Sequence, residues 1–220
     1  MIEKRNPKED AEHAGIACSG AVLAGGESRR FGQDKAHAVL AGKPLVSHVV
    51  ETLQVLFEDV LIVTNEPVAY EHFDVTVVSD IVRGAGSLGG LLTALVHAKE
   101  ERCFVVACDM PFLNPTLIRR MLGRCKGLDV VVPSVQGDLQ PLHAIYSRRC
   151  IGHIQERIAE GEFRIFDFYP EVLTLRFEER LCLEVDPENR SFANINTQEA
   201  LARARRWIEG LEQRNDDRQG

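Results

Sequence analysis

The 220-residue sequence contains no apolar run that approaches the roughly 20 residues needed to span a bilayer. Its first residues, Met1 to His13, are polar and charged where a signal peptide would be apolar. Lys and Arg number 26 against 33 Asp and Glu, a formal net charge of −7 that excludes a broad basic surface for nucleic acid or anionic membrane. We therefore expect a cytosolic protein that binds neither nucleic acid nor membrane and holds any anion locally.

Signals for disulfides and zinc are also missing. The six cysteines form no C-x-x-C pair, and several lie inside apolar, strand-like runs. The seven histidines show neither H-x-x-x-H nor H-E-x-x-H spacing. The sequence predicts reduced, mostly structural thiols and no zinc site.

Hydrophobic residues make up 45% of the chain, enough for a sizeable core. Apolar runs rich in β-branched residues alternate with stretches of helical period, which predicts an α/β fold: a three-layer structure with a mostly parallel, twisted sheet and helices on both faces. We expect one domain over residues 14–210, with disordered ends at 1–13 and 211–220. The predicted strands are 16–23, 60–65, 75–80, 103–109, 128–133 and 139–147. The predicted helices are 44–57, 88–99 with a Ser87 cap, 115–123 with an Asn114 cap, one ending at Gly161, and 200–208 with a Thr197 cap.

Polar residues follow the predicted strands where ligands of open α/β sheets bind, outside the carboxyl ends. Asn65, Asp80 and Asp109 stand at three such ends and should converge on one edge. A carboxylate at the end of the apolar strand before Asp109 is costly unless a cation pairs with it, and beside phosphates that cation would be Mg²⁺. The alternative is an aspartate that only caps the turn before Pro111.

The segment LAGGESRRFGQDK, residues 23–35, follows the first predicted strand. Glycines there let backbone N–H groups approach an anion, and cations bind phosphate oxygens. The pattern is not a Walker A loop, because Gln33 follows Gly32. It indicates a nucleotide triphosphate site rather than a solvated turn. The glycines are Gly25, Gly26 and Gly32, and the cations are Arg29, Arg30 and Lys35.

A second glycine-rich segment, GAGSLG at 84–89, satisfies G-x-G-x-x-G, and Asp109 lies twenty residues beyond Gly89. This is a competing dinucleotide fingerprint of the kind found in dehydrogenases. Residues 80–83 separate it from its strand, however, whereas a dinucleotide turn follows the strand at once. It would also leave the first glycine-rich segment without a role.

Four motifs, LAGGESRRFGQDKA, GSLGGLLTAL, CDMPF and FANINTQEAL, resemble those of molybdenum cofactor guanylyltransferases, a nucleotidyltransferase group with a GT-A-like sheet. The resemblance covers residues 17–208 and implies transfer of GMP from GTP to the terminal phosphate of molybdopterin, with Mg²⁺ as cofactor. It also implies proteins of cofactor synthesis or acceptor molybdoenzymes as candidate partners. The implied nucleotide-binding residues are Leu23, Ala24, Gly25, Gly26, Lys35, Asn65, Asp80, Gly86, Gly90 and Asp109. The implied catalytic residues are Arg29, Lys35 and Asp109, the last also the metal ligand, and the implied molybdopterin-binding residues are Arg164, Asn194 and Asn196.

Two departures from the family pattern stand in these motifs. Ser87 replaces the usual proline of the second glycine-rich segment, and Phe31 replaces a methionine. Guanine is favoured over cytosine as the base of the nucleotide only because the motif is LAGG, where a cytidine-transferring relative would have LAAG. A cytidylyltransferase or another small nucleotidyltransferase therefore stays open, as does a GTP-binding or cofactor-escort protein without turnover.

Overall fold

The computed structural model describes residues 16–25 and 38–216. Its main sheet has eight strands, most of them built from apolar runs rich in β-branched residues. The strands are β1 (Ser19–Leu23), β4 (Val60–Val63), β5 (Thr76–Val78), β6 (Arg102–Ala107), β7 (Val130–Val135), β8 (Asp138–Leu139), β9 (His143–Ser147) and β10 (Thr174–Phe177). They lie in the order β10-β7-β9-β6-β1-β4-β5, with β8 paired to β7.

The sheet is mostly parallel, as the sequence predicts. β1 is parallel to β4 and β6, β5 is parallel to β4, and β10 is parallel to β7. Only β8 and β9 are antiparallel to their neighbours. The carboxyl ends of β6, β1, β4 and β5 therefore meet at one edge of the sheet, called the carboxyl edge below; the opposite side is the amino edge.

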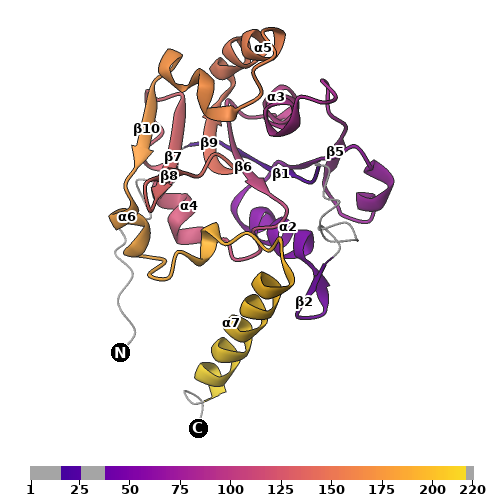
Figure 1. The fold of residues 1–220 in the computed structure, drawn as a ribbon, viewed down its shortest axis with the longest axis vertical. Coiled ribbons are helices and arrows are strands. Elements are labelled where there is room, and N and C mark those ends of the chain that lie inside the picture. The colour runs from indigo at the N-terminus through magenta and orange to yellow at the C-terminus, as the bar shows by residue number, and fades with distance from the viewer. Residues whose placement is uncertain (1–15, 26–37, 217–220) are drawn as a thin grey trace.

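Helices cover both faces of the sheet, which makes three layers (Figure 1). One face carries α2 (Leu45–Leu56), α4 (Pro115–Leu122) and α6 (Glu179–Leu183), and the other carries α3 (Gly86–His97), α5 (Ile151–Ala159) and the 3-10 helix η5 (Ile165–Glu171). Alternating side chains of β1 supply the two cores: Val22 packs into the first, Ala21 and Leu23 into the second. The last helix, α7 (Gln198–Asp216), projects away from the sheet (Figure 1).

Local chemistry sets two of the helix starts as predicted. The Asn114 side chain accepts hydrogen bonds from the N–H groups of Thr116 (2.9 Å) and Leu117 (3.2 Å) before α4. The Thr197 hydroxyl accepts one from Ala200 N (3.1 Å) before α7. α7 continues beyond its predicted end at Ile208.

The Ser87 cap and the single strand over 139–147 are wrong. α3 begins at Gly86, because Gly84 and Gly86 adopt positive φ (84° and 57°) and turn the chain into the helix before Ser87. The last predicted strand is two strands, β8 and β9, separated by a segment that contains Pro141, which has no N–H to donate.

A short hairpin, β2 (Val39–Leu40) and β3 (Lys43–Pro44), was not predicted. Its two-residue turn places Ala41 and Gly42 at positive φ, 49° and 79°. Leu40 and Leu45 beside it form a third small core with Ala204 of α7. In the described part of the chain, no helix combines the length and the apolarity that crossing a membrane requires.

Candidate functional site

The last residues of β1, β4, β5 and β6 lie side by side in the register of the sheet. Backbone hydrogen bonds continue one residue past them, for example from Ala24 N to Val63 O (2.8 Å) and from Cys108 N to Leu23 O (3.2 Å). Two residues past the four ends stand Gly25, Asn65, Asp80 and Asp109. The structure thus places these four predicted residues in one row along the carboxyl edge.

Asn65 and Asp80 are in direct contact within this row. Asn65 Nδ2 donates a hydrogen bond to Asp80 Oδ2 at 2.8 Å. A β-carbon placed on Gly25 would lie 3.9 Å from the same oxygen, so the backbone of the first glycine-rich segment passes close to the carboxylate. Asn65 is exposed and Asp80 is half-exposed, which leaves the pair accessible to a ligand.

The second glycine-rich segment closes the row on the α3 side. Gly90 packs so closely on Leu23 that a β-carbon would lie 3.2 Å from Leu23 Cδ1. The buried Thr93 hydroxyl accepts from Ile81 N (3.0 Å) and donates to Gly89 O (2.8 Å), which ties the turn after Asp80 to the helix. No described side chain caps the start of α3, where Gly86 lies. The predicted residues Leu23, Gly86 and Gly90 therefore adjoin this row.

Asp109 is joined to the segment that carries two predicted molybdopterin-binding residues. Ile195 N donates to Asp109 O at 2.8 Å. Ile195 is fully buried, while its neighbours Asn194 and Asn196 are exposed, the alternation of an extended chain. The structure thereby brings Asn194 and Asn196 beside Asp109, which is itself half-exposed.

Arg164 does not share this layer. It is exposed and immediately precedes η5, whose Ile165 packs into the core on the α3 and α5 side of the sheet. Phe192, just before the asparagines, packs into the core on the other side. Gly26, Arg29 and Lys35 lie outside the described residues, so their predicted roles stay predictions.

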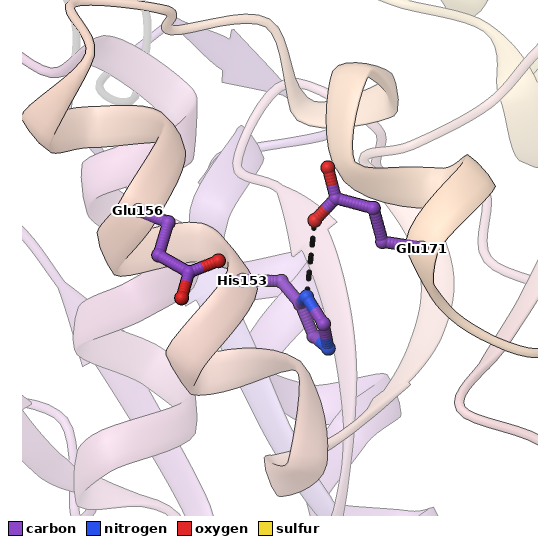
Figure 2. A group of neighbouring side chains, drawn as sticks. All are labelled: His153, Glu156 and Glu171. Atoms are coloured by element: carbon purple, nitrogen blue, oxygen red, sulfur yellow. Dashed lines mark hydrogen bonds and ion pairs between the residues drawn. The ribbon is translucent and has the colours of Figure 1, made fainter.

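A group of possible metal ligands lies elsewhere and was not predicted: His153, Glu156 and Glu171 (Figure 2). The i, i+3 spacing of the first two on α5 was the available sequence signal, whereas Glu171 comes from η5. His153 Nδ1 already lies 3.0 Å from Glu171 Oε2, and Arg157 Nη2 lies 3.5 Å from Glu171 Oε1. The group is a surface ion-pair cluster.

The six cysteines are free and, apart from the half-buried Cys108, buried, in agreement with the structural role predicted for them. Burial opposes the charged thiolate and raises the pKa of Cys125 to about 11 and that of Cys182 to about 12. Such thiols stay protonated at neutral pH and do not act as nucleophiles.

Comparison with known proteins identifies the family of this chain. Residues 20–172, which include the row from Gly25 to Asp109, match the model of the MobA-like NTP transferase domain. The chain belongs to this family. As a MobA-like NTP transferase it is a nucleotidyltransferase, and the competing dehydrogenase interpretation of GAGSLG is not supported.

Relatives of similar length extend the match. The molybdenum cofactor guanylyltransferase of Desulfosudis oleivorans is 37% identical over 190 residues, 86% of this chain and 94% of that protein. The probable molybdenum cofactor guanylyltransferase of Pelotomaculum thermopropionicum is 38% identical over 191 residues, 86% and 93% of the two chains.

Solved structures of the MobA-like kind share the fold. Molybdopterin-guanine dinucleotide biosynthesis protein A from Archaeoglobus fulgidus superposes with a TM-score of 0.77 at 29% identity, over 87% of this chain and 99% of that one. A 4-diphosphocytidyl-2C-methyl-D-erythritol synthase from Anaerococcus prevotii gives 0.66 at 13% identity, over 88% and 99%, a likeness of fold alone. The predicted nucleotidyltransferase sheet is confirmed.

Proposed function

We propose that this protein transfers GMP from GTP to the terminal phosphate of molybdopterin, forming the guanine dinucleotide cofactor and pyrophosphate. The observation that carries the proposal is the row of Gly25, Asn65, Asp80 and Asp109 at the carboxyl edge, in a chain that is 37–38% identical to proteins named for this activity.

The residues of this row suit the two halves of a nucleotide. The Asn65 amide holds one oxygen of the Asp80 carboxylate, which leaves that carboxylate oriented to accept hydrogen bonds from a base or ribose. Gly25 brings backbone close to the same carboxylate, and the absence of a side chain at Gly90 lets α3 pack closely on Leu23 at the end of β1. The N-terminal end of α3 adds the positive end of a helix dipole near the expected phosphates.

Asp109 fits a magnesium ion. Mg²⁺ takes oxygen ligands and is commonly held by one or two carboxylates together with substrate phosphates and water. Asp109 offers a half-exposed carboxylate at the end of β6, in the row that we assign to the nucleotide. When bound, the ion would neutralise charge on the triphosphate.

The chemistry needs no protein nucleophile. An oxygen of the terminal phosphate of molybdopterin, anionic at neutral pH, forms a bond to the α-phosphorus of GTP, while the bond from that phosphorus to the bridging oxygen breaks and pyrophosphate leaves with the electron pair. Positioning and charge neutralisation then account for catalysis. We assign positioning of the nucleotide to Asn65 and Asp80, and neutralisation of charge to Arg29 and Lys35. Positioning of the acceptor is assigned to Asn194 and Asn196 on one face of the sheet and to Arg164 on the other.

The test is a panel of GTP, CTP, ATP and NAD, each assayed for binding and for turnover with molybdopterin, with and without Mg²⁺. We expect pyrophosphate and the guanine dinucleotide cofactor only from GTP with Mg²⁺. Turnover with CTP would replace the proposal by a cytidylyltransferase. GTP binding without pyrophosphate would replace it by a GTP-binding or cofactor-escort protein.

A further inference from the structure

The segment from Asp186 to Asn196 links α6 to α7 and carries both asparagines at the site. Its first residue, Asp186, is only 7% exposed. The Asp186 carboxylate accepts two backbone hydrogen bonds, one from Arg190 N to Oδ1 (3.0 Å) and one from Ser191 N to Oδ2 (2.8 Å). One buried side chain thus organises the turn that leads toward Asn194 and Asn196.

The backbone of the segment is wound tightly around this carboxylate. Asn189 N donates to Asp186 O (2.9 Å), and Phe192 N donates to Asn189 O (3.1 Å). Asn189 adopts the left-handed conformation, with φ 51°, and its Nδ2 donates to Glu179 Oε1 of α6 (3.0 Å). Several hydrogen bonds within the chain therefore hold the turn in this conformation.

The segment also packs on the sheet. Phe192 contacts the ring of His143 on β9, with centroids 4.8 Å apart, and His143 in turn lies edge-on to Phe104 of β6 at 5.1 Å. Burial lowers the pKa of His143 to about 3, so this imidazole stays neutral and serves as a packing group. These ring contacts therefore fix the position of the turn relative to the sheet.

Its far end is attached at the site. Ile195 donates its N–H to Asp109 O and buries its side chain with Leu40, Leu45 and Ala204. The two asparagines on either side of Ile195 are thereby held beside Asp109 from both directions, by the Asp186 turn before them and by the core under α7 after them.

We infer that Asp186 is a positioning residue for the acceptor substrate. Through the turn that its carboxylate organises, it places the Asn194 and Asn196 amides where their N–H groups can donate to an acceptor that bears a phosphate. This inference rests on the proposed function. Displacements of about 1 Å in such groups are enough to weaken binding substantially.

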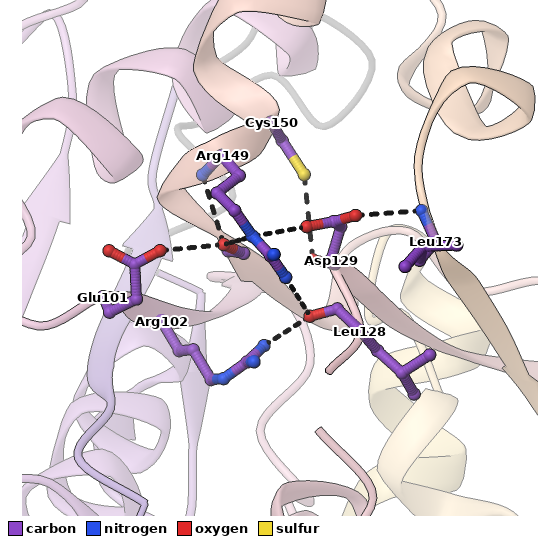
Figure 3. Close-up of polar contacts among 8 residues, drawn as sticks. Glu101, Arg102, Leu128, Asp129, Arg149, Cys150 and Leu173 are labelled. Carbon is purple, nitrogen blue, oxygen red and sulfur yellow. Dashed lines mark hydrogen bonds and ion pairs between the residues drawn. The ribbon is translucent and has the colours of Figure 1, made fainter. Parts of the chain in front are cut away.

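The test compares Asp186→Asn with a matched variant, Asp129→Asn. Asp129 is equally buried, 8% exposed, and its Oδ2 accepts a backbone hydrogen bond from Leu173 N (2.9 Å; Figure 3). It directly precedes β7 and so lies at the amino edge. We expect both variants to lower the unfolding midpoint in urea. Only Asp186→Asn should raise KM for molybdopterin, about tenfold, with KM for GTP unchanged.

A second variant tests the same role of the turn if Asp186→Asn folds poorly. Asn189→Ala perturbs the same turn, because alanine is disfavoured at φ 51° and loses the bond to Glu179. In a double-mutant cycle for molybdopterin KM, Asn189→Ala and Asn194→Ala should be non-additive, since the first acts through the second.

An unchanged molybdopterin KM in both turn variants, additive effects in the cycle, or equal KM changes in Asp129→Asn would overturn the role of Asp186 while leaving GMP transfer intact. Absence of transfer by the unmodified protein would instead overturn the proposed function, and this inference with it.

Discussion

At the amino edge of the sheet, Asp59 and Asp129 are buried and surrounded by hydrogen-bond donors of the chain itself, whereas Asp80 and Asp109 at the carboxyl edge are half-exposed. Asp129 accepts from Leu173 N and lies 2.8 Å from Arg149 Nε (Figure 3). The carboxylates at the amino edge are enclosed by the fold, and those at the carboxyl edge are reached by solvent.

The surface hollow at the amino edge is not suited to a phosphate ligand. A hollow of about 480 Å³ opens at the amino edge, but its lining sets three acidic residues, Glu58, Asp59 and Glu100, against one cation, Arg119, and this net negative charge repels phosphate. The size of a hollow therefore does not by itself identify the nucleotide site of this protein. The same carboxylate chemistry stabilises the fold where the chain supplies all partners, and it is available for binding where solvent reaches it.

The largest effect should come from removing Asp109. We expect Asp109→Ala to cost about 2–4 kcal/mol of barrier, or roughly 30- to 1000-fold in GMP transfer, because the carboxylate that would hold Mg²⁺ beside the triphosphate is lost. The bond from Ile195 should persist in this variant, since it uses the Asp109 backbone oxygen. The measurement is pyrophosphate release with GTP, molybdopterin and Mg²⁺, and near-normal turnover would refute the metal role.

Next in size is the loss of stability on removing the Asp59 charge. Burial opposes ionisation, but hydrogen bonds from Ser19 and Lys99 N, together with the Lys99 ammonium, outweigh it and hold the pKa of Asp59 below its ordinary value. A lowered pKa in the folded state stabilises the fold above the unfolded value, about 3.9, and the contribution is lost as pH falls through the folded value.

Asp59→Asn should therefore cost about 2–3 kcal/mol at pH 7, with GMP transfer unchanged once folded, and less as the pH falls below about 4. Urea unfolding at pH 7, 5 and 3 measures the difference. A difference that stays constant over this range would show that the charge does not act as described.

A smaller effect is expected at Gly89 in α3. A β-carbon there would lie 2.9 Å from Val82 O, a backbone atom that cannot rotate away. Gly89→Ala should cost about 1–2 kcal/mol and raise KM for GTP, because the turn after Asp80 must shift. Gly152→Ala on the exposed face of α5 is the control; it meets nothing within 4 Å and should be neutral or slightly stabilising. Thermal unfolding and GTP titration distinguish the two variants, and equal behaviour would argue against the close contact.

The smallest effect should follow Arg149→Gln at the amino edge. The Arg149 side chain is 56% exposed, so its ion pair with Asp129 is screened by water. We expect less than about 1 kcal/mol in urea unfolding and unchanged turnover. A loss of activity in this variant would show that the amino edge also contributes to the reaction.

Much of the fold was predictable because its signals are local. Apolar, β-branched runs indicated β1, β4, β5 and β6, and the caps at Asn114 and Thr197 depend on residues only a few positions away. The split between β8 and β9 depends on their pairing with β7 and β6 as well as on Pro141, and of these only the proline is visible in the sequence.

The candidate site was predictable in part for the same reason. A strand end is visible in sequence, so Asn65, Asp80 and Asp109 could be named in advance. The contact of Asn65 with Asp80 depends on segments that are distant in the chain, for which one sequence carries no signal. The same holds for the packing of Ile165, next to Arg164, and Phe192, near Asn194, on opposite faces of the sheet.

By itself, then, the sequence determined which residue types follow each strand and which chemistry they can perform, since both are properties of neighbours along the chain. Only the tertiary structure decided which of these side chains share an edge, which are enclosed, and which stay open. That choice is made by strand register, by the packing of the 186–196 segment on the sheet and by the small core that α7 forms with Leu40, Leu45 and Ile195, interactions that exist only when remote parts of the chain meet.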